Sequence, residues 1–447
     1  MRTIPTVATT SLLFGVTLLS AGGCAPAGSG SGLPPQPGVV QSASSDNTTK
    51  SQAWPQYGYD SGHSGFNPLE KVIGAKNVST LQIAWNNQNI IQPSGIVVAG
   101  SVAYVADQDQ ANGSVFALNA NTGKQKWATD VGLNGSWGSF EAVPAVSGNV
   151  VLTPCSNNSP SNFKTGICGL NAKSGKLMWS QLCVAGYCGL TTSPGVTGSV
   201  AYYQFSDNYF TEYTQAVDPK TGHVLWQDAG TSDCKDAGPG GDLPLPAAGG
   251  YIFAAAACQG SQHNETDVCA LATSSGTSVW CRDLQTQYIT SLFEGGGTLY
   301  ATASGGSTSK LVALNEKRGT VKWSKTLPNI ASDAFAAADG RVFIDFHNAT
   351  GLIAFSARNG KQLWTQTTGV TAAISVANGI VYTDAGGGNN GDHAITALNE
   401  KTGAIVWGSD AGNGASPATA VVLKGTIYAG CYTMCAFRLP AKHSRAI

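Results

Sequence analysis

Charged side chains are scarce in this sequence of 447 residues: only 11% are Asp, Glu, Lys or Arg. A soluble domain usually carries about 25%. Lys and Arg total 25, the formal net charge is −1, and the basic residues never form a run. Binding to nucleic acid or to a membrane surface through a basic patch is therefore excluded. Beyond the N-terminal segment no apolar stretch reaches about 18 residues, so we expect no other segment to span a bilayer.

Material for a hydrophobic core is plentiful. Apolar residues make up 42% of the chain, which includes 10 Trp, 14 Tyr and 14 Phe, so wholesale disorder is excluded. The 56 Gly and 19 Pro favour many short strands joined by tight turns over a helical bundle.

The first 24 residues have the order of a targeting segment. Arg2 gives a positive start, an apolar stretch runs from Leu12 to Leu19, and Ala21-Gly22-Gly23 precede Cys24. Small residues before a Cys resemble a bacterial lipobox. The resemblance implies that residues 1–23 are removed and that Cys24 carries lipid on its sulfur and its amine. The alternative is an ordinary secretory peptide that is cut a residue or two away.

A linker and a short tail flank the remaining chain. Residues 25–52 consist of Gly, Ser, Pro and polar residues, which predicts a flexible linker attached to Cys24. Its coil dimension would be on the order of 30 Å, enough to hold a folded domain away from the membrane. Residues 441–447 are expected to be a C-terminal tail.

One pattern recurs seven times: a small residue and an apolar residue, several polar residues, a glycine and a tryptophan. In each copy the glycine lies four residues, and the small-apolar pair nine and ten residues, before the tryptophan. The copies begin at Ala117, Gly169, Ala216, Ala270, Ala313, Ala354 and Ala397. Such a fixed spacing is the signature of a repeat architecture.

Each repeat predicts a small antiparallel sheet. Turn-forming residues such as Asn119 to Gly123 predict a type I turn closed by a left-handed glycine. Alternating or β-branched runs such as Val102 to Val105 predict the preceding strands. A unit of about 46 residues cannot bury both faces of its sheet, so the units must stack side by side.

An eighth unit is split between the chain ends. Residues 415–440 supply its early strands and end in Ala436-Phe437, whereas Leu81 to Trp85 supply a Trp strand without the earlier part. A ring whose N-terminal strand completes its last sheet removes the exposed sheet edges. The sequence therefore predicts an all-β, eight-bladed β-propeller of four-stranded blades over residues 53–440. A seven-bladed ring is the main competitor.

The repeat resembles the tryptophan-docking repeat of pyrroloquinoline-quinone (PQQ) enzymes and PQQ-like propellers. Residues 54–85 are similar to the segment that opens such propellers. The resemblance implies that each Trp packs between its own Ala and the Gly turn of the next blade, as a structural girdle. The residues concerned are Trp85, Trp127, Trp179, Trp226, Trp280, Trp323, Trp364 and Trp407.

The landmarks of a quinoprotein dehydrogenase are missing. In that family Ca²⁺ is held near PQQ by a Glu, an Asn and an Asp, and many members have a disulfide between adjacent Cys. This chain has no adjacent Cys pair, no acid in residues 152–169 where the Glu is expected, and no Gly-Thr-Gly-Asn-Pro stretch. We expect no catalytic residue, metal or cofactor; PQQ with calcium is the alternative.

Eleven Cys behind an export signal predict an oxidising compartment. The repeat phase predicts three equivalent cross-strand bridges, Cys155–Cys168, Cys258–Cys269 and Cys431–Cys435. Cys183, Cys188, Cys234 and Cys281 can form two more bridges with three pairings; Cys183–Cys188 with Cys234–Cys281 is the weakly preferred one. Zinc binding is the rival, but the spacing without paired His is poor.

By length and anchor the chain resembles the propeller lipoprotein of the outer-membrane β-barrel assembly machine and other PQQ-like lipoproteins. This implies a non-catalytic scaffold, bound to the cell membrane or the outer membrane and facing the periplasm or the cell exterior. We expect a monomer that binds a protein or an envelope component. The alternatives are a PQQ-dependent dehydrogenase and a sugar-binding domain, the latter suggested by Trp137, Tyr202, Tyr203, Tyr209 and Phe210.

Overall fold

The computed structural model describes most of the chain from residue 53 to residue 440. The described ranges are 53–91, 93–107, 113–132, 143–157, 164–183, 189–190, 192–206, 212–228, 234–235, 245–258, 266–286, 288–305, 308–329, 331–346, 351–367, 374–384, 395–409 and 420–440. The predicted signal segment, Cys24, the linker and the tail lie outside them. Within these ranges no helix is long and apolar enough to cross a membrane.

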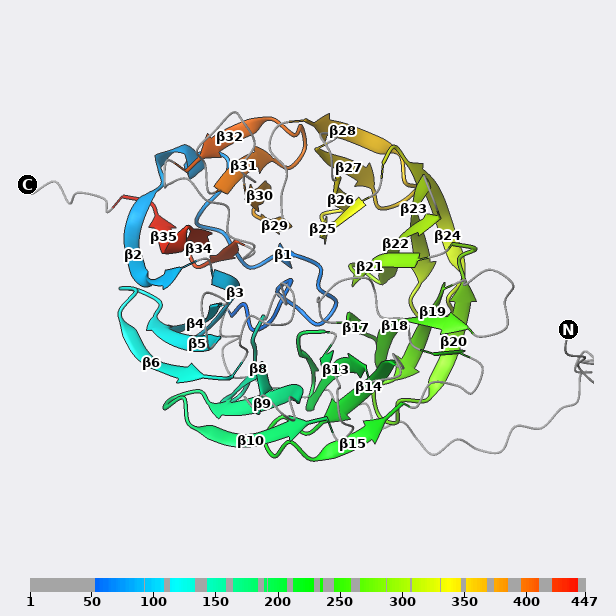
Figure 1. The fold of residues 1–447 in the computed structure, drawn as a ribbon. Coiled ribbons are helices and arrows are strands. Elements are labelled where there is room, and N and C mark those ends of the chain that lie inside the picture. Colours follow the sequence, from blue (N-terminus) through cyan, green and yellow to red (C-terminus); the bar gives the residue numbers. More distant parts are fainter. Residues whose placement is uncertain are drawn as a thin grey trace, which may run out of the picture. The chain divides into compact units, whose positions relative to one another are not determined.

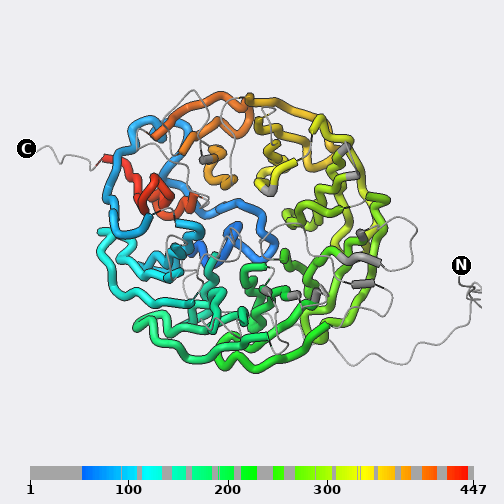
Figure 2. Tube along the Cα trace, viewed as in Figure 1, coloured from blue at the N-terminus to red at the C-terminus, as the bar shows by residue number. Residues whose placement is uncertain are grey.

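The described residues form eight small sheets arranged in a ring, so the predicted eight-bladed propeller is confirmed and a seven-bladed one is wrong (Figure 1). Each blade has four main strands, and the chain visits the blades in order (Figure 2). Only one short 3-10 helix, η1 (Val78–Thr80), interrupts the β structure of the described chain.

Blades 1 to 4 follow one another from residue 93. Blade 1 consists of β3 (Pro93–Ala99), β4 (Val102–Asp107), β5 (Ser114–Asn119) and β6 (Gln125–Asp130). Blade 2 consists of β7 (Ala145–Ser147), β8 (Val150–Ser156), β9 (Thr165–Asn171) and β10 (Leu177–Leu182). Blade 3 consists of β11 (Gly189–Leu190), β12 (Gly195–Thr197), β13 (Val200–Ser206), β14 (Glu212–Val217) and β15 (Val224–Gln227). Blade 4 consists of β16 (Cys234–Lys235), β17 (Ala247–Ala248), β18 (Tyr251–Cys258), β19 (Thr266–Ala272) and β20 (Ser278–Asp283).

Blades 5 to 8 complete the ring. Blade 5 consists of β21 (Tyr288–Glu294), β22 (Thr298–Gly305), β23 (Thr308–Asn315) and β24 (Val321–Leu327). Blade 6 consists of β25 (Ala331–Ala338), β26 (Arg341–Phe346), β27 (Leu352–Ser356) and β28 (Gln362–Gln366). Blade 7 consists of β29 (Ile374–Ala377), β30 (Ile380–Asp384), β31 (Ile395–Asn399) and β32 (Ile405–Gly408), with β1 (Phe66–Asn67) parallel to β29. Blade 8 consists of β33 (Val421–Leu423), β34 (Thr426–Cys431), β35 (Thr433–Arg438) and β2 (Gln82–Ile91).

Blade 8 closes the ring with strands from both chain ends. The N-terminal strand β2 pairs antiparallel with β35, and Trp85 lies opposite Ala436. The indole ring of Trp85 also lies 6.1 Å from the ring of Tyr428 on β34. The hydrogen bonds between β2 and β35 complete blade 8 and so join the two ends of the chain within one sheet.

The tryptophans join each blade to the next. Trp85 of blade 8 donates a hydrogen bond from Nε1 to the Ala120 carbonyl of blade 1, at 3.2 Å. Its ring lies against Gly123, where an added Cβ would come within 2.5 Å of the indole. The same bond joins Trp127 to Ala172, Trp179 to Pro219, Trp226 to Thr273, Trp280 to Glu316, Trp323 to Ala357 and Trp364 to Glu400. Each acceptor lies three residues before the glycine of the next blade.

Trp407 is docked differently, because blade 8 has no glycine turn between its third and fourth strands. Those strands, β35 and β2, belong to opposite ends of the chain. The ring of Trp407 instead packs edge-on against Phe437, with centroids 5.4 Å apart, in a cluster with Val78 of η1 and Leu81. The segment before β2 therefore fills the place of the missing turn.

Candidate binding face

The N-terminal segment, residues 54–67, lies in the middle of the ring, and we call it the strap (Figure 1). It begins with a two-way backbone pair, in which Trp54 N donates to Val98 O at 2.7 Å and Val98 N donates to Trp54 O at 2.8 Å. It ends in β1, which adds a parallel strand to blade 7. Similarity to the opening segment of propellers gave no sign of this course through the centre.

The strap bonds to the innermost strand of every blade in chain order. After Trp54 on blade 1, the bonds are Val146 N to Pro55 O (2.7 Å), Val196 N to Gln56 Oε1 (2.8 Å), Ala247 N to Ser61 O (2.6 Å), Glu294 N to Gly62 O (2.7 Å), Ala337 N to Ser64 O (2.7 Å), Val376 N to Gly65 O (2.7 Å) and Asn67 Nδ2 to Val422 O (2.8 Å). All eight positions lie at or beside the C-terminal end of an inner strand. The strap therefore covers one end of the ring.

Small residues let the strap approach the blades. At Gly65 the backbone has φ +68°, and an added Cβ would lie 2.9 Å from the Cβ of Ala336.

The Asp60 carboxylate accepts bonds from Ser64 N at 3.0 Å and Ser64 Oγ at 2.7 Å, which hold the bend between them. Burial raises the pKa of Asp60, and these hydrogen bonds oppose that rise.

Glu294 couples the strap to pH. Burial, aided by the charge of Glu316, raises the pKa of Glu294 from 4.5 to about 7, although its carboxylate accepts bonds from Gly297 N and Thr298 N. The native state thus binds a proton more tightly than the unfolded chain. Stability from this group is present below pH 4.5 and is lost as pH rises through about 7.

We expect Glu294→Gln to remove this pH dependence, because the amide oxygen still accepts both bonds but carries no charge. Between pH 4.5 and 7, the free energy of unfolding of the unaltered protein should fall by up to about 1.4 kcal/mol per pH unit from this group alone. Urea unfolding at a series of pH values measures the slope. Equal slopes in the two proteins would contradict the assignment.

The opposite end of the ring is the one not covered by the strap. We call it the loop face, and define it by the strand ends where the second strand of a blade stops and the third begins, such as Asp107 and Ser114. Two exposed tyrosines lie here among the described residues, Tyr288 at 61% and Tyr432 at 49% exposure. Tyrosine is enriched at protein interfaces.

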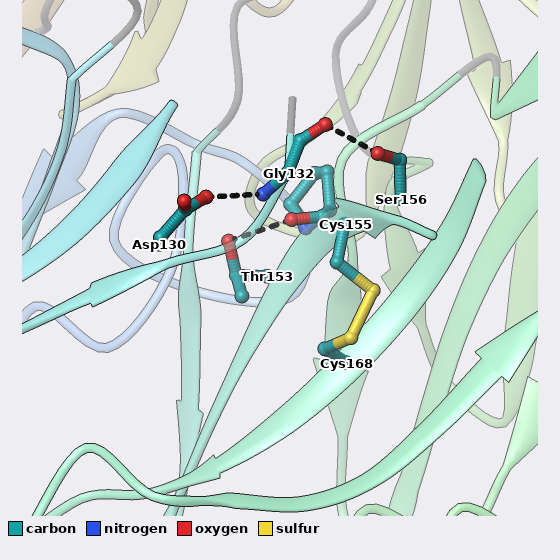
Figure 3. Close-up of a disulfide and its surroundings, with 7 residues drawn as sticks. Asp130, Gly132, Thr153, Cys155, Ser156 and Cys168 are labelled. Carbon is teal, nitrogen blue, oxygen red and sulfur yellow. Dashed lines mark hydrogen bonds between the residues drawn. A yellow bond between two sulfur atoms is a disulfide. The ribbon is translucent and has the colours of Figure 1, made fainter. Parts of the chain in front are cut away.

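Disulfides reinforce the strands near the loop face. Cys155 of β8 is bonded to Cys168 of β9, with Cα atoms 5.7 Å apart, as the repeat phase predicts (Figure 3). Beside this bridge, Ser156 Oγ donates to the Gly132 carbonyl, and Gly132 N donates to Asp130 Oδ1 at 2.8 Å. Cys431 and Cys435, the other pair expected at this position, are bonded across the β34–β35 hairpin.

The expected Cys258–Cys269 bridge is wrong. Cys269 is bonded to Cys281, directly opposite on β20, which also rules out Cys234–Cys281. The reason is the length of β18. In blade 2, Cys155 lies two residues after the residue opposite Cys168. In blade 4, Cys269 lies opposite Ala254, so the equivalent position is Ala256, and Cys258 lies two residues further along the strand. In the backbone register Cys258 pairs with Cys234 of β16. Cys183 is disulfide-bonded; Cys188, its expected partner, lies outside the described residues.

A family model described as outer membrane protein assembly factor BamB matches residues 70–233, 211–369 and 328–439. The chain belongs to this family. A search of curated proteins finds no match.

Solved structures agree with the BamB-family fold. A europium-containing methanol dehydrogenase has a TM-score of 0.63 at 14% identity, covering 87% of this chain and 91% of that one. The computationally designed Ika8 protein has a TM-score of 0.59 at 12% identity, covering 80% and 99%. A quinohemoprotein alcohol dehydrogenase from Comamonas testosteroni has a TM-score of 0.50 at 15% identity, covering 85% and 84%. At these identities the similarity shows the fold alone.

The ligands that the quinoprotein resemblance implies can be compared with the described part of this BamB-family propeller. The resemblance to quinoproteins implies a Glu, an Asn and an Asp around Ca²⁺. Among the described residues no group of three or more His, Cys, Asp or Glu side chains could hold a metal ion. The stretch of blade 2 where the Glu is expected carries the Cys155–Cys168 bridge instead.

Proposed function

We propose that this BamB-family chain is a lipid-anchored scaffold of the bacterial cell envelope with no catalysis of its own. It binds another protein or envelope component through the loop face. The observation that carries this is the strap, which bonds to all eight blades and covers one end of the ring, so we assign the partner to the opposite end. The exposed Tyr288 and Tyr432 supply aromatic contact area on that face.

The anchor belongs to the same proposal. Cys24 carries the lipid, and the linker of residues 25–52 lets the propeller stand on the order of 30 Å from the bilayer. Tethering raises the effective concentration of a binding face for partners in the same membrane. A monomer is sufficient for this role, because the ring is closed within one chain.

Site-specific photocrosslinking in intact cells tests the face. A photoreactive residue at Tyr288 or Tyr432 should give the same discrete adduct, whereas one at Lys317 or Lys401, in turns at the strap end, should give none. Cys24→Ala should abolish both the lipid, measured by mass spectrometry of the mature N-terminus, and the adduct. Adducts from the strap-end positions alone would contradict the choice of face. Tight binding of PQQ with Ca²⁺, together with dye-linked alcohol oxidation, would overturn the non-catalytic role.

A further inference from the structure

A pocket of about 220 Å³ lies between blades 2 and 3 at the loop face. Blade 2 contributes the ends of β9 and β10, including Gln181, and blade 3 contributes β13, β14 and β15. The aromatic lining is Tyr203, Phe205 and Tyr213, and the remaining polar lining includes Gln215 and Gln227. The pocket is separate from the strap, which bonds to blades 2 and 3 at the opposite end of their strands.

Among the described residues, none of the side chains that line this pocket is charged. An ionic ligand would therefore lose its hydration without meeting a counter-charge, which is costly. The lining combines aromatic carbon with amides and hydroxyls, and so selects a neutral ligand that has both an apolar face and hydrogen-bonding groups.

The aromatic side chains form one continuous surface. The rings of Phe205 and Tyr213 have centroids 5.3 Å apart and planes 22° apart, and the rings of Tyr203 and Phe205 have centroids 6.3 Å apart. Phe205 and Tyr213 are only partly buried, whereas Tyr203 is 2% exposed. Two rings held nearly parallel and open to the pocket provide a platform for the C–H face of a ring-shaped ligand.

A directional chain of hydrogen bonds orients the amides. Tyr203 Oη donates to Gln215 Oε1, and Gln215 Nε2 donates to Gln227 Oε1 at 2.9 Å. This fixes Gln227 with its Nε2 as the outward-facing donor. The side-chain amide of Gln181, on the opposite wall, makes no hydrogen bond with the rest of the described chain. One wall thus presents an oriented donor and the other presents a free amide.

The repeats show that the fold does not require this set. The positions equivalent to Tyr203 hold Val105, Thr153, Ala254, Ala301, Ile344, Thr383 and Ala429 in the other blades. The position of Gln227, directly after the docking tryptophan, is Ser180 in blade 2 and Ser324 in blade 5. Blade 3 therefore departs from the repeat at several positions that converge on one pocket.

We propose that this pocket binds a neutral sugar residue. A pyranose ring offers a C–H face for Phe205 and Tyr213, and hydroxyls that can accept from Gln227 and bond to Gln181. The aromatic residues that line the pocket differ from those that the sequence suggested for sugar binding. Tyr202 is fully buried and does not line the pocket, whereas Tyr203 does; Trp137, Tyr209 and Phe210 lie outside the described residues.

Titration calorimetry and saturation-transfer NMR on the purified, folded protein test the proposal with cellobiose, maltose and N,N′-diacetylchitobiose. We expect at least one to bind with a Kd in the millimolar range or below. Glucose and glucuronic acid form a matched pair, because they differ by one carboxylate, and glucose should bind more tightly. Phe205→Ala and Gln227→Ala should each weaken binding by about tenfold.

Ser324→Ala is the control, since it changes an exposed residue at the repeat position of Gln227 in a blade without the pocket. Its affinity should equal that of the unaltered protein, and thermal unfolding confirms that each variant is folded. Absence of binding by all three disaccharides, preference for glucuronic acid, or unchanged affinity in both pocket variants would overturn the proposal. None of these outcomes bears on crosslinking from Tyr288 and Tyr432, so the scaffold role is tested separately.

Discussion

Gly123→Ala is expected to lower the free energy of unfolding by about 3 kcal/mol or more. Two costs add. Gly123 has φ +69°, a conformation that costs an L-residue about 1–2 kcal/mol. The new Cβ would also lie 2.5 Å from Cε3 of Trp85, and such overpacking costs about 1–3 kcal/mol. Urea unfolding followed by tryptophan fluorescence measures the change.

Gly100→Ala is the matched control. Gly100 lies in the β3–β4 turn of the same blade with φ +61°, but an added Cβ meets nothing within 4 Å. It should therefore show the conformational cost alone, about 1–2 kcal/mol. The difference between the two variants measures the docking of Trp85. Equal destabilisation would show that the tryptophan and the glycine turn contribute no packing energy to ring closure.

The repeat was predictable from sequence because its determinants are local. The turn from Asn119 to Gly123 forms within its own hairpin: Asn119 Oδ1 accepts bonds from Asn121 N and Thr122 N, and Gly123 N donates to Asn119 O. A fixed offset then places each tryptophan opposite its own small residue, such as Trp127 opposite Ala117. The closure of the ring was predictable for the same reason. Trp85 and Ala436 are the two halves of one repeat, at opposite ends of the chain, and they lie opposite each other in blade 8.

The strap and the Cys258 pairing could not be predicted in this way. The strap bonds mainly through backbone carbonyls, such as those of Ser61 and Gly62. Because every residue has a backbone carbonyl, such bonds cannot be recognised from residue types. Its small residues are a signal of close approach, but they do not specify the partner. The cysteine pairing failed because β18 continues past the expected end of its repeat, so that Cys258 lies opposite Cys234.

The pocket also depends on relations between blades. Tyr203 and Gln181 come from adjacent sheets, and their approach is set by the docking of one blade on the next. The sequence shows Tyr203 only as one of several aromatic residues in blade 3. The repeat register separates it from Tyr202, because neighbouring residues on a strand point to opposite faces.

Trp54→Ala is expected to cost about 3–5 kcal/mol, as do other aromatic truncations in a core. Trp54 is 1% exposed, packs edge-on against Tyr59 with centroids 5.2 Å apart, and belongs to a cluster that joins blades 1 and 8. Alanine keeps the backbone pair with Val98 but leaves a cavity behind it. The first attachment of the strap should therefore open more often while its later attachments hold.

Native-state hydrogen exchange distinguishes this local opening from a general loss of stability. In Trp54→Ala the amides of Val98 and Val146, which donate to the strap, should lose protection more than that of Val376 at its far end. Phe253→Ala, a fully buried truncation in blade 4, should destabilise the protein without this gradient. Lys71→Ala, exposed just after the strap, should change stability by less than about 0.5 kcal/mol. Equal loss of protection at Val98 and Val376 would contradict this prediction. It would mean that the strap opens only when the whole ring unfolds, with the same free energy of opening as the blades.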